Sequence, residues 1–189
     1  IVDHIDTDDS WRLRKEIVLQ NVYTNMTSLI AEAKDDKKYT SLAVLKPKEI
    51  HDFIIEKSER EWDKKKLDRL KANAQQLNLF KNSDNPFEVV QKLPYKFSYK
   101  FTSDDGIVRT LMIEDWEIGA LYWNSLKRHD GDEKGACADV KAKYSDDFAK
   151  TKDLYLFLGT TREFHLIAPN PFVIIGTFHP KKIFQGSLF

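Results

Sequence analysis

The clearest hydrophobic pattern in the chain lies between residues 95 and 129. Aromatic and polar residues alternate strictly from Tyr95 to Thr102, a period of two that is typical of a strand with one buried face. Residues 103–106 (Ser-Asp-Asp-Gly) have the composition of a tight turn. The apolar residues then return at 107–113, so this stretch predicts a β-hairpin.

The hydrophobic period changes after this hairpin. Between residues 115 and 129 the apolar positions cover more than half of a helical circumference, which predicts a largely buried helix with Trp116 and Trp123 in the core. Acidic residues stand at its start and basic residues at its end, as the helix dipole favours.

The remaining C-terminal pattern predicts one more helix and one more hairpin. Residues 133–150 place apolar side chains along one helical face. The runs 154–159 and 172–178 are almost continuously apolar, which predicts two buried central strands joined by the loop 160–171. The order hairpin, helix, helix, hairpin indicates an α+β fold with a mostly antiparallel sheet.

The N-terminal part has shorter and less regular patterns. The strands expected there are residues 11–23, 26–33, 42–45 and 50–55. Pro47 cannot donate to a strand ladder, so we expect it at an edge or bend between the last two. Residues 59–79 have apolar positions at helical spacing and predict an amphipathic helix with a charged outer face.

The most linker-like composition follows that helix. Residues 81–94 contain Ser, Asp, Asn and two prolines, which favours a linker or a crossing loop. The sequence therefore predicts a β-rich N-terminal region at 1–80, ending in the charged helix, and an α+β domain at 95–189.

Composition restricts the function less than it restricts the fold. The 189 residues include 30 Lys+Arg and 30 Asp+Glu, so the formal net charge is zero. This balance weakens a nucleic-acid or anionic-membrane role without excluding it. Cys137 is the single cysteine, which favours a reducing, cytoplasmic compartment. No apolar run approaches the roughly 18 residues of a membrane-spanning helix, so no membrane is expected as a partner.

Two groups of residues are candidates for a chemical site. Glu114, Asp115 and Glu117 lie at a strand-to-helix junction, where they would either cap the helix or bind Mg²⁺ or Mn²⁺ as in a metal-dependent nuclease. Outside that alternative we expect no cofactor and no catalytic residues. The second group would form a small polar pocket, or else lie on an ordinary surface loop; its members are Thr160, Arg162, His165 and His179.

Two pentapeptides, QLNLF at 76–80 and QGSLF at 185–189, resemble the Gln-Leu-x-Leu-Phe peptide by which bacterial polymerases and repair proteins dock on the replication sliding clamp. The resemblance implies that Gln76 enters a polar pocket while Leu79 and Phe80 fill an apolar groove. The second copy has Gly186 in place of one anchor. In the alternative interpretation these side chains pack against the chain's own core. The residues concerned are Gln76, Leu77, Leu79, Phe80, Gln185, Leu188 and Phe189.

The segments LKPKEI, REW, MIEDWEIGALYW and NPFVIIGTFHPKK together resemble a family of uncharacterised prokaryotic proteins associated with mobile-element and defence gene neighbourhoods. The resemblance implies a role near DNA metabolism but no particular activity. We therefore expect a non-enzymatic binding or adaptor protein in a complex acting on nucleic acid, with a protein partner such as a sliding clamp. The alternative is a metal-dependent nuclease or other hydrolase.

Overall fold

The computed structural model describes residues 2–5, 10–13, 19–64, 68, 91–161 and 163–182. The chain divides into two compact units, residues 1–54 with 97–189 and residues 55–96. In chain order the elements are β1 (Val2–Ile5), β2 (Ser10–Leu13), the 3₁₀ turn η1 (Leu19–Asn21), β3 (Val22–Tyr23), α2 (Met26–Ala33), β4 (Leu42–Leu45), β5 (Glu49–Lys57), β6 (Tyr95–Thr102), β7 (Val108–Met112), α4 (Trp116–Arg128), α5 (Glu133–Lys141), the π-helix η2 (Ala142–Ala149), β8 (Tyr155–Thr160) and β9 (Phe172–Phe178). The fold is α+β, as the sequence predicts.

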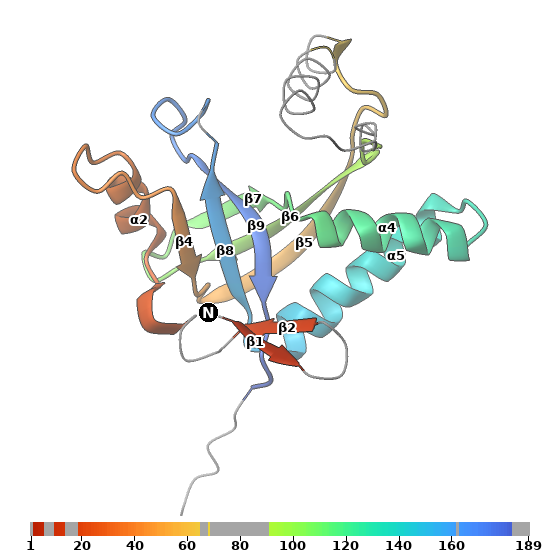
Figure 1. Ribbon diagram of the computed structural model, residues 1–189, viewed down its shortest axis with the longest axis horizontal. Helices are drawn as coiled ribbons and strands as arrows, with labels where there is room; N and C mark the ends of the chain where they lie inside the picture. Colours follow the sequence, from red (N-terminus) through yellow and green to blue (C-terminus); the bar gives the residue numbers. More distant parts are fainter. Residues whose placement is uncertain are drawn as a thin grey trace, which may run out of the picture. The chain divides into compact units, whose positions relative to one another are not determined.

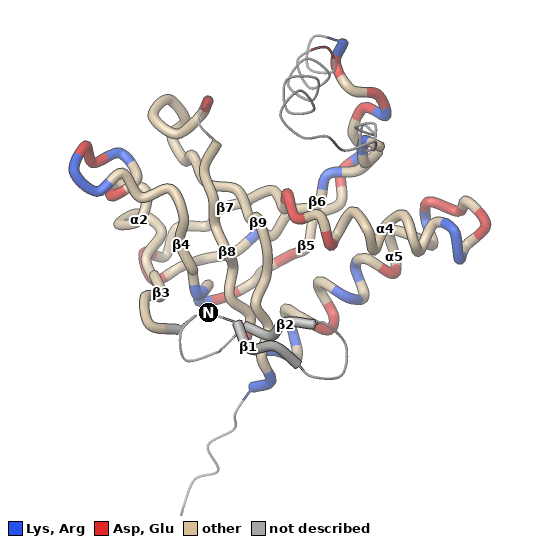
Figure 2. The backbone as a smooth tube through the Cα atoms, viewed as in Figure 1, with Lys and Arg blue, Asp and Glu red and all other residues tan. Residues whose placement is uncertain are grey.

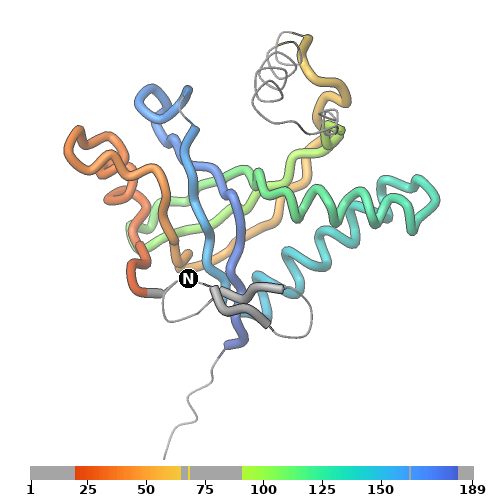
Figure 3. The backbone as a smooth tube through the Cα atoms, in the orientation of Figure 1, coloured from red at the N-terminus to blue at the C-terminus, as the bar shows by residue number. Residues whose placement is uncertain are grey.

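The described strands form three sheets (Figure 1). One contains β1 and β2, a second has the order β3-β4-β8-β9, and a third has the order β5-β6-β7. Pairing is antiparallel in β1–β2, β4–β8, β6–β7 and β8–β9, and parallel between β3 and β4. The four-stranded sheet thus combines strands from both sides of the predicted linker, of which residues 81–90 lie outside the described part. Figure 3 follows this return of the chain from β4 to β8.

The predicted β6–β7 hairpin is confirmed and carries much of the core. Phe97, Tyr99 and Phe101 are buried, while Gly106 takes a φ of 72° in the turn, a conformation that favours glycine. Phe53 packs against these strands, with its ring centroid 5.4 Å from that of Tyr99. The alternation in the sequence therefore marks the buried face.

The predicted helix after the hairpin is also confirmed, but its buried face is narrower than expected. The side chains of α4 that are fully buried are Ile118, Tyr122 and Ser125. Trp123 is half-buried, and Trp116 is 80% exposed, so the prediction that both tryptophans lie in the core was wrong. Trp116 is the first residue of α4, where the chain has only just left the sheet, and the helix buries one stripe instead of most of its surface.

The second predicted helix exists as α5 continued by η2. Its expected face is buried, with Ala136, Val140, Tyr144 and Phe148 inside. The last eight residues adopt π-helical turns, a form that occurs mostly in short segments. The carbonyl oxygen of Tyr144 accepts a hydrogen bond of 2.6 Å from the Tyr99 hydroxyl, which joins η2 to β6.

Residues 26–33 form the helix α2, so the strand predicted there was wrong. Its buried side chains, Met26, Leu29 and Ala33, recur at helical spacing. The Asn25 side chain caps the helix by accepting a hydrogen bond of 3.0 Å from the backbone N–H of Ser28.

The prediction of two central C-terminal strands is half right. β8 lies between β4 and β9, but β9 is the last strand of its sheet. Beyond it, among the described residues, lies one parallel bridge between Ile113 and Ile174. A β-bulge accompanies the pairing of β8 with β9 at Phe157 and Leu158.

In the unit of residues 55–96, a short cluster surrounds Lys92. Its ammonium group lies 5.8 Å from the centroid of the Trp62 ring and donates a 2.9 Å hydrogen bond to the carbonyl oxygen of Glu61. Of the predicted helix at 59–79, Lys64 and Asp68 are helical, and most of the rest lies outside the described residues.

Candidate functional site

The loop between β8 and β9 (residues 161–171, called here the β8–β9 loop) is fixed by a buried histidine. The Nε2 atom of His165 lies 2.7 Å from the carbonyl oxygen of Ala33, and its Nδ1 atom lies 2.6 Å from the Thr160 hydroxyl oxygen. Because a carbonyl can only accept, Nε2 carries a proton and donates to Ala33, and in the neutral imidazole Nδ1 accepts from the Thr160 hydroxyl. His165 thus caps the last residue of α2 and holds the loop against that helix.

Further contacts hold the same loop. The Lys34 ammonium group donates a hydrogen bond of 3.2 Å to the carbonyl oxygen of Pro169. The Tyr39 ring stacks on the His165 ring with centroids 4.1 Å apart, and Tyr39 takes a positive φ of 46° in doing so. Within the loop, the N–H of Ala168 donates to the carbonyl oxygen of Phe164 at 3.0 Å. The loop is therefore braced against α2 and the segment that follows it.

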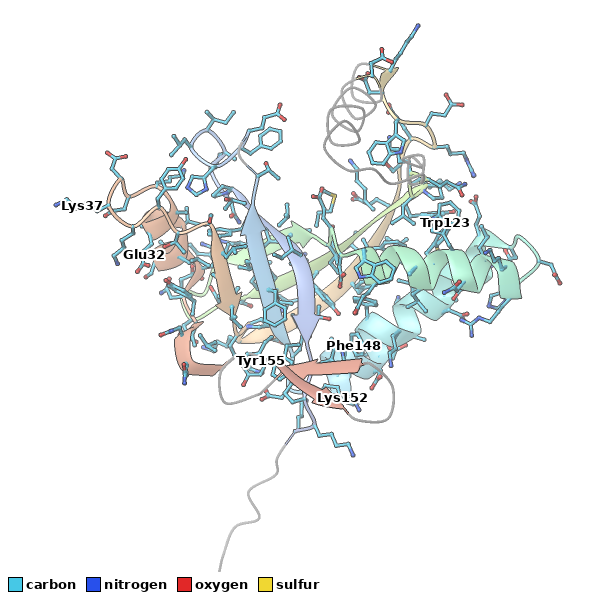
Figure 4. All side chains as sticks on the ribbon, in the orientation of Figure 1. Glu32, Lys37, Trp123, Phe148, Lys152 and Tyr155 are labelled. Atoms are coloured by element: carbon cyan, nitrogen blue, oxygen red, sulfur yellow. The ribbon has the colours of Figure 1, made fainter. Side chains whose placement is uncertain are left out.

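This bracing presents large apolar side chains to solvent. Phe164, Leu166 and Ile167 are 49%, 57% and 75% exposed, and Tyr39 beside them is also exposed. Figure 4 shows these loops at the upper left, with Glu32 and Lys37 marking the neighbouring α2 segment. Several large apolar side chains gathered on one loop are typical of a surface that contacts another molecule.

The structure brings together only part of the polar group predicted at 160–179. Thr160 and His165 are hydrogen-bonded, but His179 follows β9 at the opposite end of the β8–β9 hairpin, so a shared pocket with His165 is not formed. Arg162 lies outside the described residues. His179 stacks instead on Phe148, with ring centroids 3.6 Å apart, and its burial lowers the pKa of the imidazole.

The acidic residues before α4 lie where the sequence predicts them. Asp115 is the N-cap of α4, and its Oδ1 atom accepts a hydrogen bond of 3.0 Å from the N–H of Glu117. Burial raises the pKa of the Asp115 carboxyl, against the lowering effect of that hydrogen bond. The backbone N–H of Glu114 donates to the carbonyl oxygen of Ile174 in β9 at 2.7 Å. Over the described ranges, no three His, Cys, Asp or Glu side chains are grouped so that they could hold a metal ion.

Both pentapeptides predicted to bind a partner, at 76–80 and 185–189, lie outside the described residues. Cys137 is half-buried, and burial raises the pKa of its thiol. None of the described helices is long and apolar enough to cross a membrane.

The model of a protein family described as a domain of unknown function (DUF8757) matches residues 22–189. The chain belongs to this family. Comparison of this DUF8757 member with curated proteins and with solved structures gave no match. The matched range includes α2, the β8–β9 loop and the strands that brace them, so the candidate site lies inside the family's domain.

Phe164, Leu166 and Ile167 are not among the functional residues predicted from the sequence. Three large apolar residues in a segment with neither helical nor strand periodicity, between two apolar runs, were a signal that could have been used. Tyr39 carried no such signal, because only the fold brings it to His165.

Proposed function

We propose that this chain is a non-enzymatic binding subunit of a complex that acts on nucleic acid, and that the β8–β9 loop docks on a protein partner. The observation that carries the proposal is the exposure of Phe164, Leu166 and Ile167 on a loop that His165 holds in place. Asp115 caps α4 by accepting a hydrogen bond from the N–H of Glu117, which is the structural role expected of it alongside a binding function.

The energetics of the loop favour docking. Full burial of a Leu, Ile or Phe side chain contributes about 1.5–3 kcal/mol relative to leaving it exposed. Ordering a flexible loop on binding would offset much of that gain. Here the hydrogen bonds of His165 and Lys34 already order the loop in the free protein, so less of the gain is lost on binding.

The partner that fits the pentapeptides is a sliding clamp. A single pentapeptide, with Phe80 or Phe189 buried in a clamp groove, would bind weakly. Two pentapeptides on one chain would add avidity against a ring with repeated grooves. Calorimetric titration of a bacterial sliding clamp with the intact protein, then with Phe80→Ala and Phe189→Ala singly and together, measures this directly. Absence of heat with the intact protein would remove the clamp as the partner.

The docking loop is tested by copurification from a host that expresses the tagged protein. The variant Leu166→Ser/Ile167→Ser replaces the two most exposed of the loop's large apolar side chains. The matched control, Ile107→Ser/Val108→Ser, removes two comparably exposed apolar side chains at the start of β7. We expect a specific partner to be lost with the loop variant and kept with the control. Equal recovery with the wild type and both variants would refute docking through this loop.

A further inference from the structure

Lysine side chains gather at the end of the four-stranded sheet that lies away from the β8–β9 loop. There β4 ends, β8 begins and β9 ends (Figure 2). We call these residues the lysine cluster; its members are Lys46, Lys143, Lys150, Lys152, Lys181 and Lys182.

Backbone and side-chain contacts hold these lysines close to one another. A β-bridge pairs Lys152 with Lys181, and the N–H of Asp153 donates to the carbonyl oxygen of Pro180 at 2.8 Å. The Lys182 ammonium group donates a 2.9 Å hydrogen bond to the carbonyl oxygen of Lys150, which brings the segment after β9 to the end of η2. Figure 4 marks Lys152 beside Tyr155 and Phe148 at this end of the sheet.

The cluster carries an excess of positive charge. Its ion-pair partners among the described residues are Asp146, Asp147 and Asp153, so the lysines outnumber these aspartates by two to one. This excess is local, because the whole chain has a net charge of zero. A local cationic surface on a neutral protein attracts a polyanion to one place.

The aspartates leave the lysines available to such a ligand. The pairs of Lys150 with Asp146 and of Lys143 with Asp147 link neighbouring turns of η2 and are largely exposed. Exposed pairs of this kind contribute little to stability and hold the lysine weakly. A phosphate oxygen can therefore take the place of the carboxylate, or share the ammonium group with it.

We propose that the lysine cluster binds the phosphate backbone of nucleic acid. The choice of nucleic acid among polyanions rests on the proposed function, whereas the cationic surface does not. An anionic membrane is less well matched, because surface-binding elements place exposed apolar side chains next to their lysines. The large apolar side chains of Leu166 and Ile167 are exposed at the loop end of the β8–β9 hairpin, whereas the lysine cluster lies at the other end of that hairpin.

The contacts of this surface predict sequence-independent binding. The aromatic rings at the cluster, Phe148 and Tyr155, are buried and packed against His179 and Phe178, so they offer no free face for stacking a base. Recognition would then rely on ammonium–phosphate contacts. If Lys150, Lys152, Lys181 and Lys182 each neutralise a phosphate, the slope of log K against log salt for duplex DNA is about −3 to −4.

Fluorescence anisotropy of labelled duplex and single-stranded oligonucleotides measures this binding between about 50 and 200 mM salt, where phosphate contacts weaken most visibly. The variant Lys150→Gln/Lys181→Gln removes two charges of the cluster. The control Lys37→Gln/Lys127→Gln removes two exposed charges elsewhere and leaves the same net charge. We expect the cluster variant to weaken binding about tenfold at low salt and to flatten the slope by about 2, while the control changes neither.

Several outcomes would overturn the proposal. These are no binding by the wild type at the lowest salt concentration, equal losses in both double variants, or binding to phosphatidylserine vesicles without binding to oligonucleotides. The single variant Lys181→Gln is measured as well, in case the double variant does not fold. The loop variant Leu166→Ser/Ile167→Ser should bind oligonucleotides as the wild type does, so failure of the docking loop and failure of the lysine cluster are distinguishable.

Discussion

The strongest test of this fold is the removal of Asp105, in the turn between β6 and β7. Its Oδ2 atom accepts hydrogen bonds from the N–H of Thr27 at 3.0 Å and from the Thr27 hydroxyl at 2.6 Å. Its Oδ1 atom accepts from the Ser103 hydroxyl at 2.7 Å and from the N–H of Ile107 at 3.1 Å. Arg109 contacts both oxygens, the closer at 2.8 Å. The carboxylate therefore ties the hairpin turn to the start of α2.

The size of the effect follows from the burial of this pair. The side chains of Asp105 and Arg109 are only 8% and 13% exposed. Asp105→Ala leaves the Arg109 guanidinium without its carboxylate and the N–H of Thr27 without its acceptor. Breaking a buried ion pair from one side costs about 3–5 kcal/mol. We expect about 3 kcal/mol, the lower end, because water can reach part of the Thr27 and Ile107 backbone.

The same carboxylate gives the loss a pH dependence. Desolvation raises the pKa of Asp105, but the hydrogen bonds from Arg109, Thr27 and Ser103 outweigh it and hold the pKa well below its ordinary range. A carboxyl whose pKa is lower in the folded protein stabilises that protein at any pH above the pKa that the carboxyl has in the unfolded chain, which is about 4. This stabilisation is lost as the pH falls towards the pKa of the folded state. The stability difference between wild type and Asp105→Ala should therefore be largest near pH 7 and shrink below about pH 4.

Urea denaturation, followed by circular dichroism at about pH 7 and about pH 3, measures both effects. Asp104→Ala is the matched control, because Asp104 is the exposed neighbour in the same turn and its removal changes the charge equally. We expect the control to alter stability by less than about 0.5 kcal/mol. Equal losses for the two variants, or a loss for Asp105→Ala that does not shrink at low pH, would refute the role assigned to this network.

Three further predictions concern α4 and the loop anchor. Ile118→Ala should lower the free energy of unfolding by about 2–5 kcal/mol because the side chain is buried. Trp116→Ala should lower it by less than about 1 kcal/mol because that side chain is exposed. Equal losses of stability in thermal unfolding would contradict the packing of α4. Asp115→Asn should lower the melting temperature slightly and leave biological activity intact, because the residue caps a helix. Loss of activity and of Mg²⁺ or Mn²⁺ binding, at an unchanged melting temperature, would favour the nuclease alternative. His165→Ala should speed amide hydrogen exchange at the end of α2 and lower the free energy of unfolding by about 1–3 kcal/mol. Thr160→Val should have the same effects to a smaller extent. Unchanged exchange would show that His165 does not cap α2.

The sequence by itself determined the elements whose signals are local. The alternation in residues 95–102 and the turn at Gly106 are enough to predict the β6–β7 hairpin, because both signals depend on neighbouring residues. The start of α4 is predicted for the same reason, since Asp115 accepts a hydrogen bond from the N–H of Glu117, only two residues further along the chain. The α+β class rests on these elements and on the two apolar runs that became β8 and β9.

Tertiary contacts complete α2, for which the sequence carries only a short helical signal. A helix of eight residues is too short to be stable alone, and its terminal groups are satisfied from far along the chain. The N–H groups of Met26 and Thr27 donate to Ser103 and Asp105, and the carbonyl oxygen of Ala33 accepts from His165. Met26, Leu29 and Ala33 do recur at helical spacing, but the pattern spans only two turns, and the long-range partners that complete the helix lie outside residues 26–33.

The candidate surfaces depend on the tertiary structure in the same way. The pairing of β4 with β8 brings α2 and Tyr39 to the β8–β9 loop, and the pairing of β8 with β9 brings Lys152 beside Lys181. The exposure of Trp116 likewise follows from which stripe of α4 meets the sheet. Hydrophobicity along the chain gives the periodicity of an element, but the partner that covers its apolar face is set by long-range pairing, which periodicity does not encode.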